Sequence, residues 1–154
     1  MQVSDIVYLD ICCFKRPFDD ATEERVRWEA EAVAMILDHG TRGTVRLVRS
    51  PAHDFENERN PREDRRLATS LWLEMAVVQM SASAGAAERA REIAALGFSP
   101  LDALHLAFAE QSEAKWFVTP DDRLLKHART HHERLSVHVL EPDQLPLPAE
   151  GDEE

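Results

Sequence analysis

The sequence predicts an α/β fold, a three-layer α/β/α sandwich around a central parallel sheet. Short apolar segments typical of buried strands alternate with longer segments whose apolar residues recur at helical spacing. This alternation is typical of parallel strands with helices packed on both faces. The chain has 154 residues, enough for one domain with a substantial core. We assign residues 1–145 to that domain and residues 146–154 to an acidic C-terminal tail.

The first elements follow from apolar runs and helix boundary signals. Residues 6–14 are a short, strongly apolar run, which predicts a buried strand. A helix should begin near Thr22, with acidic residues in its first turn, and should end at Gly40 and Gly43. Residues 45–48 then form a second predicted strand.

Two later helices open with the same signal, a serine followed by a proline. Ser50 precedes Pro51 and Ser99 precedes Pro100. The serine oxygen caps a free backbone N–H, and proline suits the first helical position. The remaining predicted elements are a helix after residues 60–61, an extended segment at 76–80, a helix at 84–96, a strand at 115–119, a helix from Pro120 and a strand at 137–140.

Four acidic residues stand where strands should end or helices should begin, namely Asp10, Glu56, Asp102 and Asp121. In an open parallel sheet, sites gather beyond the carboxyl ends of the strands. Carboxylates brought together there repel each other unless a cation lies between them, and a divalent metal commonly fills that role. The pattern predicts a metal site for phosphate chemistry. Each acid alone also has an ordinary explanation, because aspartate is common in turns and at helix starts.

Other polar residues leave alternatives open. Glu58 competes with Glu56 for the same role. His105 follows Asp102 by three residues, on the same helix face, and we expect it to pack or to support the site rather than bind metal. A polar surface is the expected place of the group His127, His131 and His132. Two roles are compatible with the arginines at positions 16, 59, 62, 65 and 66. They are candidates for phosphate contacts, or they form a solvated helix face.

Composition restricts the partners and the compartment. Eighteen basic residues stand against 29 acidic ones, and the net charge of −11 argues against broad attraction to nucleic acid while it suits a basic protein partner. No apolar run reaches the ~20 residues that a membrane span needs, and a signal-peptide pattern is absent, so we expect a soluble cytoplasmic protein. Cys12 and Cys13, neighbours in the expected strand, point to opposite faces and are expected to be buried fillers.

Taken together and in order, four segments resemble the PIN domain family of metal-dependent ribonucleases, which have an α/β/α sandwich fold. The segments are residues 7–10, 50–56, 101–107 and 117–121, and the resemblance extends over residues 6–145. It implies that the family's acidic site maps onto Asp10, Glu56, Asp102 and Asp121, with Mg²⁺ or Mn²⁺ as the metal.

Within that resemblance, each site residue receives a role. Asp10 and Asp102 are expected to bind the metal directly, and Asp121 to bind it directly or through water. Glu56 would hold a second metal or orient the attacking water. Thr119 would hydrogen-bond a carboxylate, a water or a phosphate oxygen. A carboxylate-held metal lowers the pKa of a bound water, which is how such a site would hydrolyse RNA.

Many small members of the family resemble VapC-type toxins, which cut RNA and are held inactive by a protein antitoxin. The resemblance thus implies an RNA substrate, an antitoxin partner and a homodimer. A catalytically weak scaffold that binds RNA or a protein is the alternative function, and the net charge favours it. Retention of all four acids favours the enzyme. Two other classes fit poorly: Cys12 replaces the second acid of an Asp-x-Asp phosphotransferase, and the five glycines form no phosphate loop.

Overall fold

The computed structural model describes residues 5–16, 19–20 and 22–148, and in them five short strands form one sheet in the order β3-β2-β1-β4-β5. Every neighbouring pair of strands is parallel. In chain order the strands are β1 (Ile6–Leu9), β2 (Arg46–Arg49), β3 (Val78–Gln79), β4 (Trp116–Val118) and β5 (His138–Leu140). The predicted α/β fold with a central parallel sheet is confirmed.

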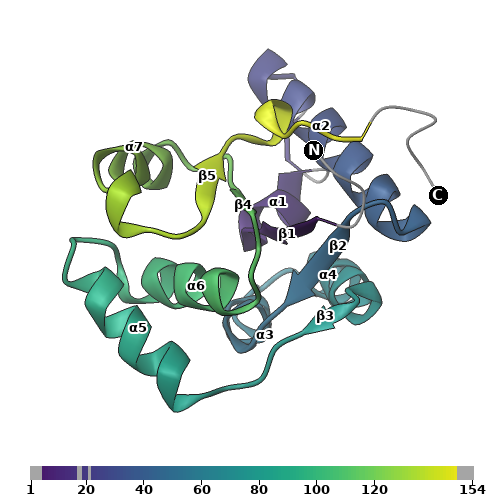
Figure 1. The fold of residues 1–154 in the computed structure, drawn as a ribbon. Helices are drawn as coiled ribbons and strands as arrows, with labels where there is room; N and C mark the ends of the chain where they lie inside the picture. Colours follow the sequence, from purple (N-terminus) through teal and green to yellow (C-terminus); the bar gives the residue numbers. More distant parts are fainter. Residues whose placement is uncertain (1–4, 17–18, 21, 149–154) are drawn as a thin grey trace.

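Seven α-helices within these described ranges connect the strands and cover the sheet. They are α1 (Ile11–Lys15), α2 (Glu24–Arg42), α3 (Pro51–Glu58), α4 (Glu63–Met75), α5 (Ala84–Ala94), α6 (Pro100–Gln111) and α7 (Asp122–Thr130). Figure 1 shows the sheet lying between helix α2 on one side and the pair α5 and α6 on the other. None of the helices in the described part is both long and apolar enough to cross a membrane.

The side chains of β1 alternate between two core clusters, one on each face of the sheet, as the two-residue period of a strand requires. Tyr8 packs in the cluster that contains Leu106 of α6. Leu9 packs in the cluster that contains Ile36 of α2. All four side chains are at most 1% exposed, so the sheet is the middle layer of a sandwich.

The central strand β1 is where the direction of winding changes. From β1 the chain adds β2 and β3 on one side, and later adds β4 and β5 on the other. At such a point the connections leave the sheet in opposite directions and open a crevice at the carboxyl ends of the strands. Asp10 follows β1 and Thr119 follows β4, so both residues lie at this crevice.

The first strand is shorter than predicted. It ends at Leu9, and the prediction of a strand over residues 6–14 is wrong beyond that point because α1 begins at Ile11. Asp10 has extended backbone angles, and its carbonyl accepts a hydrogen bond from the Cys13 N–H at 2.9 Å, which starts the helix. Apolarity alone does not distinguish a buried strand from a short buried helix.

The two cysteines consequently lie on a helix rather than on a strand. Both are free thiols. Cys13 is buried, as expected of a filler, and its Sγ donates to the Val118 carbonyl at 3.2 Å. Cys12 is only half-buried, and its Sγ donates to the Asp10 carboxylate at 3.1 Å. Cys12 therefore contacts the crevice at the carboxyl ends of the strands.

One predicted helix end is also displaced. Gly40 lies inside α2, where a Cβ atom would come within 2.7 Å of Leu47 Cδ1, so a glycine allows the helix to approach β2 closely. The helix ends at Gly43, whose φ of 80° is the left-handed conformation that glycine adopts at low cost. The extended segment predicted at residues 76–80 contains β3, which covers Val78–Gln79 alone. Most of the predicted acidic tail, from residue 149 onward, lies outside the described residues.

Candidate metal centre

Asp10 is held at the end of β1 by contacts with the end of β4. Its backbone N–H donates to the Val118 carbonyl at 2.9 Å, which continues the pairing of the two strands. The Thr119 hydroxyl donates to Asp10 Oδ2 at 2.7 Å, and Cys12 Sγ contacts the same oxygen. The side chain is buried, with 5% of the residue exposed. Asp10 is therefore a fixed carboxylate and not a turn residue free in solvent.

Asp121 lies two residues beyond Thr119 and is connected to the same hydroxyl. The Asp121 N–H donates to Thr119 Oγ1 at 3.1 Å. Asp121 Oδ1 accepts from the N–H groups of Arg123 at 2.9 Å and Leu124 at 3.3 Å, so it caps helix α7. The ordinary explanation for this acid, a helix start, thus holds, and the exposed carboxylate also faces a cavity that Asp102 lines.

Asp102 lies in the first turn of α6, where the Ser99 hydroxyl accepts its N–H at 3.2 Å. Burial raises the pKa of its carboxyl, and the negative charges of Asp10 and Asp121 raise it further. The hydrogen bond with Ser99 and the neighbouring His105 act in the opposite direction. The three aspartates predicted from separate segments are close enough to act on one another electrostatically.

Glu56 enters the group from helix α3. Its Oε1 lies 2.9 Å from His105 Nε2, and donor atoms of Asp10, Glu56 and His105 all lie within 4.8 Å of one another. Glu56 is partly buried, whereas Glu58 is exposed near the end of the same helix. The geometry thus favours Glu56 in the choice that the sequence left open.

His105 is fully buried and both of its ring nitrogens have partners. Nε2 contacts Glu56, and Nδ1 lies 2.6 Å from the Tyr8 hydroxyl. His105 is also one of the three residues whose donor atoms could hold a metal together, so its supporting role stays a prediction. Sequence reasoning missed Tyr8 itself, together with Ser50, whose Oγ lies 2.7 Å from the same hydroxyl. A tyrosine inside a fully buried strand needs a hydrogen-bond partner, and that was the available signal.

The donor set fits a hard divalent cation. Asp10, Asp102, Asp121 and Glu56 offer carboxylate oxygens, which Mg²⁺ and Mn²⁺ prefer. Across residues 5–16, 19–20 and 22–148, no lysine or arginine forms an ion pair with Asp10, Asp102 or Asp121. Burial, followed by repulsion from Asp10 and Asp121, raises the pKa of Asp102, and a bound cation would relieve the repulsion.

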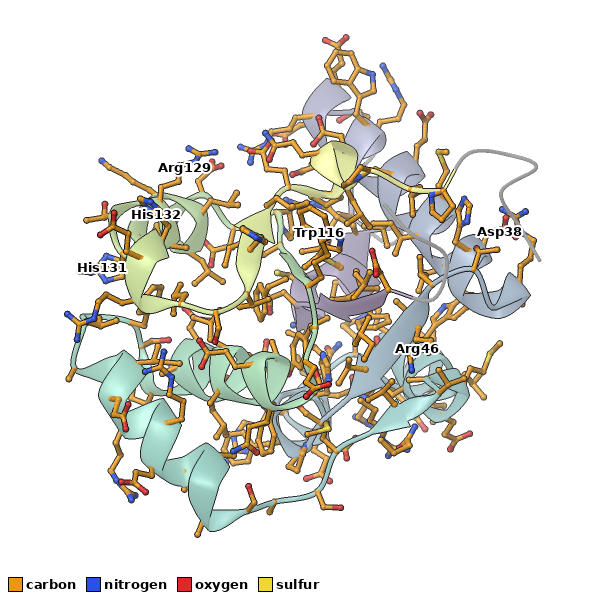
Figure 2. All side chains as sticks on the ribbon, in the orientation of Figure 1. Asp38, Arg46, Trp116, Arg129, His131 and His132 are labelled. Atoms are coloured by element: carbon orange, nitrogen blue, oxygen red, sulfur yellow. The ribbon has the colours of Figure 1, made fainter. Side chains whose placement is uncertain are left out.

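His127 lines the cavity that Asp102 and Asp121 also line, and it has local contacts there. His127 Nε2 lies 2.8 Å from the Leu96 carbonyl, and its ring packs on Phe98. Figure 2 shows His131 and His132 at the periphery beside α7, which agrees with a polar surface. The arginine partners are Glu29 and Asp19 for Arg16, the Phe55 ring for Arg59, Asp64 for Arg62, Asp19 for Arg65 and the Asn60 carbonyl for Arg66. These pairings favour the solvated helix face over phosphate contacts.

Comparison with known proteins identifies the family. A sequence model described as the PIN domain matches residues 7–130, which is most of the chain. The protein therefore belongs to the PIN domain family, as the resemblance indicated. PIN domains are generally metal-dependent nucleases, and the acidic group around Asp10 lies within the matched residues.

A solved structure supports the fold independently. A chain in the crystal structure of VapBC2 from Rickettsia felis, bound to a DNA fragment from their promoter, has a TM-score of 0.50 to this protein. The match covers 88% of this chain and 98% of that chain at 12% sequence identity. At this identity the likeness concerns the fold alone. No curated protein matches the sequence.

Proposed function

We propose that this protein is a Mg²⁺- or Mn²⁺-dependent endoribonuclease and the toxin of a toxin–antitoxin pair. The observation that carries the proposal is a group of acids in a PIN domain: donor atoms of Asp10, Glu56 and His105 lie within 4.8 Å of one another, and the charges of Asp10 and Asp121 act on the nearby Asp102. The similarity of the fold to a chain in the VapBC2 structure supports the toxin assignment.

In this proposal Asp10 and Asp102 bind the metal directly, and Asp121 binds it directly or through a water. When bound, the ion would supply a water of lowered pKa and neutralise charge on the scissile phosphate. Glu56, adjacent to Asp10, would orient the attacking water or contribute to a second metal. The Thr119 hydroxyl donates to the Asp10 carboxylate and accepts from the Asp121 backbone N–H, so this one hydroxyl would fix the spacing of two ligands.

An exposed apolar face supports a protein partner, which we propose to be the antitoxin or a second copy of this chain. Leu67, Leu71 and Met75 recur every four residues on α4 and are each at least half exposed. Trp28 and Met35 of α2 are exposed to a similar extent. Apolar residues grouped on one helix face are typical of interaction sites.

The substitution Asp10→Asn tests the enzymatic proposal. We expect it to lower metal-dependent RNA cleavage roughly 100-fold or more, because the ion loses an anionic ligand that stabilises transition-state charge. Asparagine can still accept the Thr119 hydrogen bond, so the fold should persist. The measurement is cleavage of a fluorescent RNA with Mg²⁺, with Mn²⁺ and with EDTA, alongside circular dichroism.

Asp38→Asn is the matched control, because Asp38 is an exposed acid of α2 that pairs with Arg42 (Figure 2). It should cleave as the wild type does. Equal cleavage by Asp10→Asn would refute the site. Absence of cleavage by the folded wild-type protein in either metal would favour the alternative, a scaffold that binds RNA or a protein.

The toxin role has a separate test. Induced expression should slow growth, and the Asp10→Asn variant should not. Normal growth with soluble protein that cleaves RNA in vitro would contradict the toxin role and leave the nuclease assignment intact.

A further inference from the structure

A chain of buried polar side chains runs from the interior of the sandwich to the candidate site. Ser50 Oγ lies 2.7 Å from the Tyr8 hydroxyl, which lies 2.6 Å from His105 Nδ1. His105 Nε2 in turn lies 2.9 Å from Glu56 Oε1. Ser50, Tyr8 and His105 are each 0% exposed, whereas the Glu56 side chain is 25% exposed. The chain therefore ends at the residue that reaches the crevice.

With the His105 ring neutral and Glu56 ionised, one arrangement of donors satisfies every group in this hydrogen-bond chain. An ionised carboxylate only accepts, so His105 Nε2 carries a proton and donates to Glu56. In the neutral ring Nδ1 then accepts, and the Tyr8 hydroxyl donates to it. The Tyr8 hydroxyl has a single proton, which it donates to His105. The Ser50 hydroxyl therefore donates to the Tyr8 oxygen. In this arrangement each hydroxyl is used once as a donor, and the neutral imidazole has one tautomer.

Packing and hydrogen bonds fix Tyr8 and Ser50, the two residues at the buried end of this hydrogen-bond chain. The Tyr8 ring stacks against the His53 ring, with centroids 4.5 Å apart, and against the Phe117 ring, with centroids 5.2 Å apart. The Ser50 N–H donates to His53 Nδ1 at 3.1 Å, and His53 Nε2 donates to the Leu9 carbonyl at 2.7 Å. Side chains locked by packing and hydrogen bonds are what precise positioning of a functional group requires.

We propose that Tyr8 and His105 are positioning residues, which together with Ser50 hold the Glu56 carboxylate against Asp10 in the geometry that RNA cleavage needs. This inference rests on the nuclease function proposed above. Glu56 stands near the end of a short helix on a long side chain, and a carboxylate of this kind has several rotamers. The imidazole selects one of them. Partners of site residues in other enzymes contribute in the same way without touching substrate.

The variant Tyr8→Phe tests the proposal, because it removes one hydroxyl and keeps the ring that stacks between His53 and Phe117. We expect kcat for RNA cleavage to fall roughly 10- to 100-fold, with KM and the affinity for Mn²⁺ unchanged. Thr44→Val is the matched control. The Thr44 hydroxyl lies 2.6 Å from Nδ1 of the buried His39, so this variant breaks the same kind of hydrogen bond at the far end of α2. Its kcat should equal that of the wild type.

A double-mutant cycle with Glu56→Ala separates positioning from general destabilisation. In the Glu56→Ala background, Tyr8→Phe should cause no further loss of kcat, because its effect passes through Glu56. Independent losses that multiply would overturn the proposal. A fall in Mn²⁺ affinity with His105→Asn as large as that with Asp10→Asn would also overturn it, because His105 would then be a ligand.

The metal-free protein supplies a readout that does not depend on cleavage. Long-range ¹H–¹⁵N spectra should show His105 protonated at Nε2 and accepting at Nδ1, with the Nδ1 shift altered in Tyr8→Phe and unaltered in Thr44→Val. The opposite tautomer, or a ring protonated at both nitrogens, would overturn the chain of donors. Wild-type kcat in Tyr8→Phe would overturn the positioning role alone, whereas a wild-type protein without RNA cleavage would overturn the proposed function.

Discussion

His53 is neutral inside the sandwich because both of its ring nitrogens have fixed roles. Nδ1 accepts from the Ser50 N–H, so the single ring proton lies on Nε2 and is donated to the Leu9 carbonyl. Burial, followed by the neighbouring His105 and Arg49, lowers the pKa of this imidazole to about 3, against the opposing effect of the Leu9 carbonyl. The free energy of unfolding should therefore depend on pH through this histidine.

The sign of this pH dependence follows from the number of protons that the folded and unfolded states bind at His53. Between the unfolded pKa of about 6.5 and the folded value of about 3, the unfolded chain binds more protons at this position than the native protein. Stability should fall on acidification by about 1.4 kcal/mol per pH unit in this window, or about 2 kcal/mol from pH 6.5 to pH 5. His53→Gln should remove that contribution.

The measurement is urea unfolding of wild type and His53→Gln at pH 7 and pH 5. The variant is expected to be less stable at pH 7 and to lose about 2 kcal/mol less than the wild type on acidification. His138→Gln, at an exposed position of β5, is the control and should show the wild-type slope. Identical slopes for His53→Gln and wild type would contradict the neutral, buried state.

At this scale the sequence indicated the candidate acids and the Thr119 hydroxyl that holds Asp10, but not Tyr8 or Ser50. Asp10 and Asp102 could be chosen because an acid at a strand end or helix start has few competing positions. The contact between Tyr8 and His105 joins residues 97 positions apart, and it exists only because β1 packs against α6. Local sequence contains no signal for such a pairing.

Helix α6, which carries Asp102 and His105, is attached to its neighbours through Glu110. Arg89 of α5 donates to both Glu110 oxygens, at 2.6 and 3.1 Å, and the Ser136 N–H donates to Oε2 at 2.8 Å. Burial alone would raise the pKa of Glu110, but these hydrogen bonds outweigh it and lower the pKa below the usual value. One carboxylate thus joins α5, α6 and the segment before β5.

Glu110→Gln should lower stability by roughly 1–3 kcal/mol at pH 7, because the Arg89 guanidinium and the Ser136 N–H lose the charged acceptor that the buried Glu110 side chain provides. The native-state contribution is present above the unfolded pKa of about 4.3 and is lost as pH falls through the lower folded value. The deficit of the variant should therefore shrink between pH 5 and pH 3 in urea unfolding, a range set by roughly that ordinary glutamate pKa.

Glu92→Gln is the control for this prediction, because Glu92 contacts the same arginine at 3.1 Å but its side chain is 58% exposed. An exposed pair of this kind contributes roughly 0–1 kcal/mol. A stability deficit of Glu110→Gln that stays constant from pH 7 to pH 3 would contradict a lowered pKa of Glu110 in the folded protein.

Element boundaries show which local signals were sufficient. The starts of α3 and α6 match the serine–proline signal, because capping is a local interaction between residues a few positions apart. The end of β1 was missed, because pairing with β2 and β4 determines how far the strand extends. The pattern in residues 6–14 is equally compatible with a strand and with a strand followed by a helix.

For the whole molecule, the site depends on topology. The order β3-β2-β1-β4-β5 brings the ends of β1 and β4 together, although more than 100 residues separate Asp10 from Thr119 in the chain. The alternation of strands and helices was enough to predict a parallel sheet, and a parallel sheet was enough to predict a crevice at one edge. The distances within the crevice required the structure.

A net charge of −11 also acts on the whole molecule. It opposes the approach of RNA and favours divalent cations and basic proteins. The four site carboxylates contribute to this charge, and a bound cation would offset it where the phosphate must approach. Metal binding is therefore the step on which the proposed chemistry depends.

Titration of the metal-free protein with Mn²⁺, followed by calorimetry, tests the central claim most directly. The neighbouring acids Asp121 and Asp122 provide a matched pair, because Asp121 lines a cavity together with Asp102 and Asp122 is paired with Arg25 at 2.6 Å. Asparagine also caps helices well, so Asp121→Asn should preserve α7.

We predict Mn²⁺ binding to the wild type, a loss of affinity of at least roughly tenfold in Asp10→Asn and Asp121→Asn, and wild-type affinity in Asp122→Asn. No binding by the wild type, or equal losses in the Asp121 and Asp122 variants, would contradict a metal centre formed by these carboxylates.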